Sequence, residues 1–308
     1  MQPSTRLPLE VATAFAHAMV AKAAANAGIP VISIKGPVNL HYGLREHYIA
    51  SDADFLVDPS RFDELIEILL SNDWHIRPVP LHPRMVELHS VTLKHPEWPC
   101  DLDLHRFFPG FLADRQDVFG LIWAERCLIT IAERSCWIPS MPMAWAVAAL
   151  HAHRDEIRSG ARTQLEALEE LAAERFTDDD LADLGRLLRS SGAMETLRSS
   201  IEPLGIYSRT DSARSPELAA WNIRRFAGLH PAIAVIDAVQ SRRYREAAAM
   251  ARAILLEGRP DRPRQISRPL RTEVAFFWSQ LRRVARSLSS VPRWYRVVRD
   301  ARRGGVRF

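Results

Sequence analysis

The spacing of apolar residues along the chain changes near residue 139. Before this point, short apolar runs alternate with turn residues, a pattern that predicts strands and a few helices. After it, the apolar residues recur with helical periodicity, which predicts helices and few strands. The sequence therefore predicts an α+β domain at residues 1–138, a helical domain at residues 139–258, and an arginine-rich amphipathic tail at residues 259–308.

Turn and cap residues bound the individual elements. A predicted helix over residues 9–25 is followed by Gly28, which suits a left-handed cap, and Pro37 suits the first turn of a short helix. Ser60 is placed to cap a helix over residues 61–70. The predicted strands are residues 31–34, 53–57, 74–77, 85–93 and 101–105. The predicted later helices are residues 144–157, 164–174, 178–189 and 231–256, with a linker at residues 208–215.

The composition is that of an ordinary globular protein. Hydrophobic residues make up 47% of the chain and charged residues 25%, which excludes wholesale disorder. No apolar run approaches the roughly 20 residues of a membrane span, and the N-terminus lacks the pattern of a secretory signal. The three cysteines form no CxxC pair, which argues against a disulfide framework and a zinc site. We expect a cytoplasmic protein with free thiols and no transmembrane segment.

The positive charge of the chain is concentrated in the tail. Residues 259–308 contain 14 arginines and three acidic residues, a net charge of +11, so the remainder of a chain with net charge +4 carries −7. Apolar residues between 274 and 288 line one face of a predicted helix, and Trp294 and Tyr295 add stacking surfaces. The tail is therefore expected to dock on an anionic partner, such as an RNA backbone or a membrane surface, or on the protein's own acidic body.

Two aspartates at the start of a predicted strand are the first candidates for chemistry. Asp52 and Asp54 are two residues apart, so on a strand their side chains lie on the same face. Two buried like charges cost free energy unless a cation lies between them. Carboxylate oxygens are ligands that Mg²⁺ accepts, together with water and substrate phosphates. The pair therefore predicts a magnesium site.

A second predicted strand carries further carboxylates. Asp101, Asp103 and His105 alternate with leucines and share one face of this strand. If the strand lies beside the first, one of its two aspartates completes a set of three carboxylates. Such a set can hold two metal ions about 3.5–4 Å apart, one activating a hydroxyl group and one bridging a triphosphate.

The turn between Ile34 and Pro37 meets another need of phosphoryl chemistry. Gly36 allows close approach of the backbone to a ligand, and the helix that follows offers free N–H groups to an anion. Lys35 adds a compact positive charge. The chain has only three lysines among its 41 basic residues, so a lysine in this turn favours a point-charge role over that of a solvated turn residue.

The order of these features carries a family resemblance. Over residues 28–106 the chain has a strand ending in Lys-Gly, a short helix with a tyrosine, an Asp-x-Asp strand, a helix, and a strand reading Asp-Leu-His. This order resembles the uncharacterised nucleotidyltransferase family of the polymerase-β-like superfamily, with a weaker likeness around residues 142–153. The resemblance implies a mixed β-sheet flanked by helices, and a helical bundle that closes the cleft. It also implies transfer of a nucleoside monophosphate from an NTP to an acceptor hydroxyl, with release of pyrophosphate.

The resemblance also implies roles for particular residues. Lys35 and Gly36 would form the phosphate turn, Asp52 and Asp54 would be the first two metal ligands, and Asp103 would be the third. These residues would hold Mg²⁺, in a site for two ions, with an NTP as co-substrate.

Other polar residues keep two interpretations. Arg45 and His47 lie between the turn and the aspartate pair, where they either contact a phosphate or the acceptor or belong to a plain loop. His105 is either a partner of the metal ligands or a core histidine. The remaining histidines of interest lack metal-ligand spacing and are interpreted as structural or surface residues: His82, His89, His95, His151 and His153.

Three classes of function follow from these patterns. The first is a magnesium-dependent nucleotidyltransferase that uses an NTP, ATP among the candidates, and modifies a hydroxyl of a small molecule, a protein or an RNA. The second is a catalytically silent nucleotide- or nucleic-acid-binding protein that works through its basic tail. The third is an accessory partner protein in a biosynthetic pathway. The complete set of three carboxylates favours the enzyme.

Overall fold

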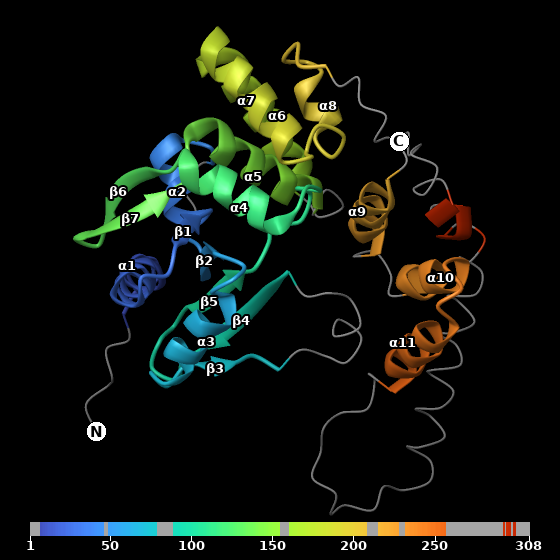
Figure 1. Cartoon of the computed structure of the whole chain (residues 1–308), viewed down its shortest axis with the longest axis horizontal. Coiled ribbons are helices and arrows are strands. Elements are labelled where there is room, and N and C mark those ends of the chain that lie inside the picture. The colour runs from blue at the N-terminus through green and yellow to red at the C-terminus, as the bar shows by residue number, and fades with distance from the viewer. Residues whose placement is uncertain are drawn as a thin grey trace, which may run out of the picture. The chain divides into compact units, whose positions relative to one another are not determined.

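The computed structural model describes residues 7–45, 49–78, 89–154, 160–207, 215–227 and 232–256, together with 292, 294–296 and 298–299. These residues fall into two compact units, one up to residue 207 and one from residue 215 onward (Figure 1). The first unit contains the sheet together with several helices from beyond residue 139. The division into three domains by residue number stays a prediction.

A five-stranded mixed sheet forms the centre of the first unit (Figure 1). Its strand order is β1-β2-β5-β4-β3. The pair β2·β5 is parallel, whereas β1·β2, β4·β5 and β3·β4 are antiparallel. The strands are β1 (Val31–Ile34), β2 (Asp52–Val57), β3 (His75–Ile76), β4 (Ser90–Lys94) and β5 (Asp101–His105). The predicted α+β fold class is thereby confirmed.

The predicted strands agree well with the observed ones near the candidate site. β1 and β5 have the predicted bounds, and β2 begins one residue early, at Asp52. β3 is shorter than predicted. The predicted strand at 85–93 corresponds to β4, and its residues 85–88 lie outside the described residues.

The alternation of side chains along β2 divides the sheet into an apolar and a polar face. Ala53, Phe55 and Val57 are fully buried, and they form one core cluster with Leu102 and Leu104 of β5. Helices α1 (Leu9–Ala27) and α3 (Phe62–Leu70) cover this core. Because side chains of a strand alternate, the aspartates between these apolar residues must lie on the opposite face.

Two of the predicted helix caps have different outcomes. Gly28 caps α1 in the left-handed conformation with φ 65°, as predicted. Ser60 does not cap α3: the N-cap position is Arg61, which makes no capping side-chain hydrogen bond. The hydroxyl of Ser60 instead donates to Asp58 Oδ1 at 2.7 Å, because Asp58 closes a tight turn directly after β2.

A helix and a hairpin between residues 115 and 138 have no counterpart among the predicted elements. They are α4 (Arg115–Ala124), β6 (Cys127–Ile131) and β7 (Arg134–Ile138). The turn between the two strands places Ala132 and Glu133 at φ 45° and 59°. Hairpin turns of this kind are usually marked by Asn-Gly or Asp-Gly, so the sequence gives no turn signal here. β7 lies against α1 and β1.

Helices beyond residue 139 pack together in the first unit. α5 (Met141–Arg154) is almost wholly buried and contacts α6, α7 and the short helix α2 (Gly36–Tyr42). The indole N–H of Trp145 donates to the carbonyl of Leu168 at 2.8 Å. The other helices are α6 (Ala161–Arg175), α7 (Asp178–Ser190) and α8 (Arg198–Ile201).

The second unit contains α9 (Pro216–Ala227), α10 (Ala232–Gln240) and α11 (Tyr244–Leu256). The predicted single helix over residues 231–256 is wrong, because Arg242 adopts φ 59° and ends the helical path between α10 and α11. Val298 is buried with Ile223 and Ile233, and Trp294 packs against them. Most of the tail, including the predicted helix at 274–288, lies outside the described residues.

Within the described part of the chain, every helix is too short or too polar to cross a lipid bilayer.

Candidate active site

The polar face of the sheet brings the predicted carboxylates together. In the parallel pair β2·β5, Asp52 lies opposite Asp101 and Asp54 lies opposite Asp103. The expectation that the two aspartate-bearing strands are neighbours is therefore confirmed. The four carboxylates thus form two opposed pairs on one face of the sheet, with the Ala53–Leu102 pair between them. The β1–α2 turn lies at the end of the neighbouring strand β1.

The β1–α2 turn has an unusual backbone. Lys35 adopts φ 58° and ψ −147°, a conformation that L-residues rarely adopt and that costs about 1–3 kcal/mol. Gly36 follows with φ 30°. A Cβ added at Gly36 would meet no atom closer than 3.6 Å, so the surrounding space would admit a side chain. The positive φ, and not a lack of space, is therefore what favours glycine here. Strain of this kind is typical of functional sites.

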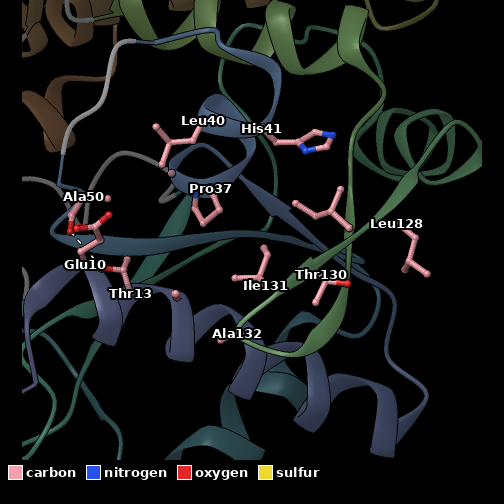
Figure 2. A pocket seen from close by; sticks show the side chains of 13 residues that line it. Glu10, Thr13, Pro37, Leu40, His41, Ala50, Leu128, Thr130, Ile131 and Ala132 are labelled. Atoms are coloured by element: carbon pink, nitrogen blue, oxygen red, sulfur yellow. Dashed lines mark hydrogen bonds between the residues drawn. The ribbon is translucent and has the colours of Figure 1, made fainter.

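A pocket of about 610 Å³ adjoins this turn (Figure 2). Side chains of α1, α2 and β6 line it. Gly36 and Ala50, which are close in sequence to Lys35 and Asp52, also line this pocket. Its apolar side chains include Pro37, Leu40 and Leu128. Apolar pockets with a few polar groups are typical of small-molecule sites. The pocket does not include the carboxylates themselves.

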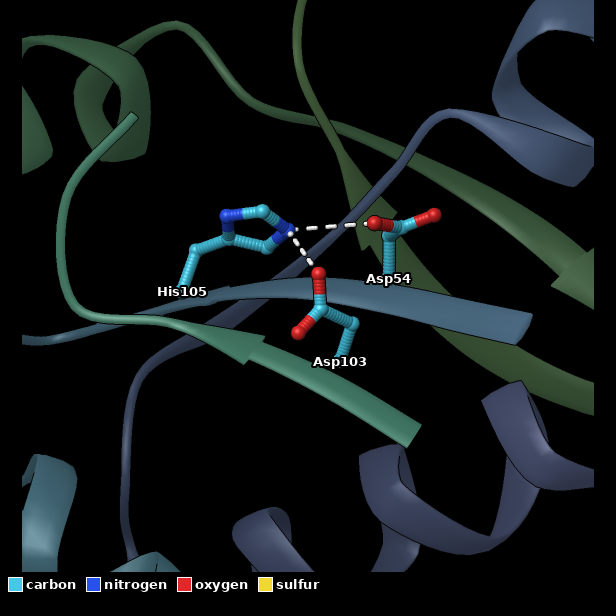
Figure 3. A group of neighbouring side chains, drawn as sticks. All are labelled: Asp54, Asp103 and His105. Carbon is cyan, nitrogen blue, oxygen red and sulfur yellow. Dashed lines mark hydrogen bonds and ion pairs between the residues drawn. The ribbon is translucent and has the colours of Figure 1, made fainter. Parts of the chain in front are cut away.

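The carboxylate of Asp54 is the centre of the candidate site. It is 4% exposed, and the Nε2 atom of the fully buried His105 lies 3.0 Å from its Oδ1 atom (Figure 3). The same Nε2 atom lies 3.1 Å from Oδ2 of Asp103. Ligand atoms of these three residues lie within 4.8 Å of one another. This spacing allows a metal ion to be shared between them.

Lys35 reaches the same carboxylate from the turn. Its Nζ atom lies 2.5 Å from Oδ1 of Asp54, and both side chains are largely buried. The prediction that Lys35 is more than a solvated turn residue agrees with this position, and its role as a phosphate ligand stays a prediction. The ammonium group also lies 5.8 Å from the ring centre of Phe108.

The two aspartates of β5 have different partners. Asp101 forms an ion pair with Arg77. Asp103 accepts a hydrogen bond from the hydroxyl of Thr92 at 3.3 Å and contacts His105. Asp103, and not Asp101, therefore faces Asp54 in the buried cluster.

The pKa values show how charge is balanced. Burial raises the pKa of Asp54, but the charges of Lys35 and His105 outweigh burial and hold it below its ordinary value. The pKa of Asp103 is likewise raised by burial and brought well below its ordinary value by His105 and Lys35. Burial lowers the pKa of His105, and the charge of Asp103 more than reverses this. Both carboxylates are therefore ionised at neutral pH.

Asp52 behaves differently. Burial and the negative charge of Asp54 raise its pKa, and Lys35 offsets this only in part. The three carboxylates of Asp52, Asp54 and Asp103 thus carry more negative charge than Lys35 and His105 neutralise. Oxygen donors with excess negative charge fit a hard cation such as Mg²⁺, so the residues present fit the ion that the sequence predicts.

Two histidines without a functional motif in the sequence, His89 and His151, lie near this cluster. The ring of His89 is 5.5 Å from that of His105, and His89 Nε2 is 3.0 Å from the guanidinium of Arg154 at the end of α5. His151 Nδ1 is 3.4 Å from the same guanidinium. Only tertiary packing brings α5 here, so no local motif could have identified these residues.

The other polar residues considered in the sequence have varied surroundings. Arg45 is exposed beyond α2, and its charge contributes to the lowered pKa of His151. His153 is buried and hydrogen-bonds Ser200 at 2.9 Å, and His95 contacts the ring of Trp74. His47, and His82, which was interpreted as a structural or surface residue, lie outside the described residues.

Comparison with known proteins identifies the family. Residues 11–202 match the family model described as uncharacterised nucleotidyltransferase. The chain belongs to this family. It is therefore a nucleotidyltransferase, a transferase of phosphorus-containing groups, and the predicted resemblance is confirmed. Among proteins with curated descriptions, none matches this nucleotidyltransferase.

Distant structural likenesses accompany the family match. An antigenic nucleotidyltransferase-like protein from Paracoccidioides brasiliensis has 12% identity and a TM-score of 0.36, covering 62% of this chain and 92% of its own. The antibiotic-resistance factor ANT(2'')-Ia has 15% identity and a TM-score of 0.37, covering 63% and 96%. A tRNA nucleotidyltransferase complexed with a primer tRNA and an ATP analog has 13% identity and a TM-score of 0.25, covering 92% and 94%. Likenesses at these TM-scores carry no argument about activity.

Proposed function

We propose that this nucleotidyltransferase depends on Mg²⁺ and moves a nucleoside monophosphate from an NTP to a hydroxyl acceptor, with release of pyrophosphate. The observation that carries the proposal is the register of β2 and β5, which sets Asp54 opposite Asp103 with Asp52 two residues away on the same face. The excess negative charge of the three carboxylates supports a metal site. Burial and then the charge of Asp54 raise the pKa of Asp52, and Lys35 offsets this only in part.

The third metal ligand is Asp103 and not Asp101. Asp103 shares His105 with Asp54, whereas Asp101 is engaged by Arg77 on the rim of the sheet. Asp52, Asp54 and Asp103 would hold the metal, which when bound supplies a Lewis acid for the α-phosphate and lowers the pKa of the attacking hydroxyl.

Each protein residue then has a defined task. Lys35 and the Gly36 turn bind the phosphates, and Lys35 also neutralises Asp54. His105 holds Asp54 and Asp103 in one orientation through its Nε2 atom. Arg45, exposed near the end of α2, is a further ligand for the nucleotide. ATP is one candidate nucleotide, and the acceptor is a hydroxyl of a small molecule, a protein or an RNA.

The free thiols support a location for this reaction. Cys100, Cys127 and Cys136 form no disulfide, although such bonds are common in oxidising compartments. We place the protein in the cytoplasm on this basis.

A labelling experiment tests the proposal. The protein is incubated with each of the four labelled NTPs and Mg²⁺, alone and with a metabolite extract or total RNA, and products are examined by mass spectrometry. The expected result is a product heavier than an acceptor by one nucleoside monophosphate, together with pyrophosphate, and no product when EDTA removes the metal. Transfer that persists in EDTA would contradict the magnesium site, and absence of any product would contradict the activity.

A further inference from the structure

The guanidinium of Arg154 is held in an unusual way. Arg154 is the last residue of α5, and its two terminal nitrogens contact His89 Nε2 at 3.0 Å and His151 Nδ1 at 3.4 Å. Among the residues that the structure describes, no aspartate or glutamate forms an ion pair with it. A partly buried arginine is usually paired with a carboxylate. Here two imidazoles take that place.

In this arrangement the contacts with the two histidines do not neutralise the guanidinium of Arg154, and they do not use all of its N–H donors. An imidazole nitrogen accepts a hydrogen bond only when it is unprotonated, so both contacts orient the guanidinium without neutralising it. Burial lowers the pKa of His151 to about 3, with the charges of Lys35 and Arg154 adding to the effect, so this histidine is neutral at physiological pH. Only two of the five N–H groups of a guanidinium are used by these contacts.

The charge also lies close to the carboxylate cluster. From Arg154 the contacts lead to His89, then across 5.5 Å between ring centres to His105, which holds Asp54 and Asp103. The charges of Lys35, Arg154 and Asp54 all contribute to the pKa of His151, so all three groups lie near enough to this histidine to affect it. Lys35 is already engaged by Asp54, whereas the cation at Arg154 has no anionic partner in the described part of the chain.

We propose that Arg154 binds the β- and γ-phosphates of the nucleotide and holds the pyrophosphate as it leaves, with His89 and His151 as positioning residues. The inference rests on the proposed function and deepens it. In the reaction, the acceptor hydroxyl loses its proton to water, its oxygen forms a bond to the α-phosphorus, and the bond from that phosphorus to the oxygen bridging to the β-phosphorus breaks. The electron pair stays on the pyrophosphate oxygen. Arg154 stabilises the charge there through parallel N–H donors and transfers no proton.

Binding of inorganic pyrophosphate to the full-length protein tests this role without knowledge of the base or the acceptor. Isothermal titration with Mg²⁺ present compares wild type with Arg154→Ala, Arg154→Lys and the control Arg162→Ala. Arg162 is 85% exposed on α6 and pairs only with Glu166 among the described residues, so its loss removes one positive charge away from the site. A second titration measures binding of Mg²⁺ alone, which depends on the carboxylates.

We expect Arg154→Ala to weaken pyrophosphate binding about tenfold or more, because a hydrogen-bonded charge is lost. Arg154→Lys should recover part of this, since a compact charge replaces a planar fork. Binding of Mg²⁺ should change less than twofold, and Arg162→Ala should match wild type in both titrations. A merely structural role for Arg154 would weaken Mg²⁺ binding as well, through His89 and His105, and would contradict the proposal.

Further outcomes separate this inference from the proposed function. Wild-type pyrophosphate affinity in a folded Arg154→Ala protein overturns the role of Arg154 even if nucleotide transfer is found. Loss of pyrophosphate binding in that variant supports the role even if no transfer is found, which would refute the proposed function alone. If Arg154→Ala does not fold, as judged by thermal melting, the same two titrations are made with Arg154→Gln. Its amide can still donate to a histidine but carries no charge, so the same outcomes support or overturn the role of Arg154.

Discussion

Lys35 shows at the scale of single residues how a strained position is maintained. Its positive φ costs free energy, and its ion pair with the buried Asp54 offsets part of this strain. A lysine at the end of a strand contributes little to a core by itself. Its sequence position could be predicted as functional, but its partner could not, because 19 residues separate the two side chains.

Lys35→Met should lower the free energy of unfolding by about 3 kcal/mol at neutral pH, because among the described residues Asp54 keeps only His105 as a buried cationic partner. Mg²⁺ should restore part of the loss by neutralising the same carboxylate, so the melting temperature of the variant should rise more with Mg²⁺ than that of wild type. Urea denaturation and thermal melting with and without Mg²⁺ measure both effects. A variant as stable as wild type, or one indifferent to Mg²⁺, would contradict this account of the charge balance.

The His105–Asp103 pair predicts a pH dependence of stability. The pKa of His105 is raised, so its contribution is present below the unfolded value of about 6.5 and is lost as pH rises through the folded value. The pKa of Asp103 is lowered, so its contribution is present above about 3.9 and is lost as pH falls through the folded value. The pair should therefore stabilise the fold most between about pH 4 and 6.5.

Denaturation of His105→Gln between pH 5 and 9 checks this dependence. The variant should lose the decline in stability that wild type shows as the pH rises through the folded pKa of His105, which lies above about 6.5. His75→Gln is a suitable control, because His75 is exposed on β3. Equal slopes in wild type and His105→Gln would show that His105 is not held by the two aspartates in the folded protein.

At the scale of elements, the parallel pairing of β2 with β5 creates the candidate site. Period-two alternation in the sequence was enough to predict both strands and the face on which each aspartate lies. The pairing itself was only an expectation, since a strand pattern does not name its neighbour. The structure adds the register, which sets Asp103 opposite Asp54 and leaves Asp101 opposite Asp52.

The register predicts different effects of two neighbouring substitutions. Asp103→Asn should reduce nucleotide transfer about 100-fold or more, because it removes a ligand charge from the centre of the site. Asp101→Asn should leave transfer within about threefold of wild type, since Asp101 contacts Arg77 on the rim. Pyrophosphate release measured with both purified proteins compares them. The opposite ranking would make Asp101 the third ligand and overturn the assignment drawn from the register.

Some elements could not be predicted from local pattern for identifiable reasons. The β6–β7 hairpin turns on Ala132 and Glu133, which give no turn signal although both have positive φ. The break between α10 and α11 is at Arg242, and arginine is a residue with high helix propensity. The Arg154 cluster joins residues 65 positions apart, which only the packing of α5 determines.

At the scale of the whole molecule, the chemistry and the basic tail belong to different parts of the chain. Every candidate site residue lies in the first compact unit. In the second unit, Trp294 and Val298 pack with Ile223 and Ile233, so the end of the tail contributes to a core there. A cut at residue 259 would remove these two residues, whereas a cut at residue 210 removes residues 211–308, the larger part of the second unit.

A chain ending at residue 210 should keep magnesium-dependent NTP binding within about threefold of wild type, because the carboxylates, the turn and Arg154 all remain. The full chain should bind RNA or anionic vesicles more tightly than the truncated chain, and this difference should shrink at high salt as the +11 charge of residues 259–308 is screened. Calorimetry and binding assays at two salt concentrations measure these effects. Loss of NTP binding in a folded truncated chain would assign the second unit to the active site.

The measurement that tests the central claim most directly is magnesium-dependent pyrophosphate release by wild type and by Asp54→Asn, with Asp63→Asn as the control. Asp63 is 74% exposed on α3, away from the polar face of the sheet. We predict that wild type and Asp63→Asn release pyrophosphate from at least one NTP only when Mg²⁺ is present, and that folded Asp54→Asn releases it at least about 100-fold more slowly. Equal rates in wild type and folded Asp54→Asn would contradict the account.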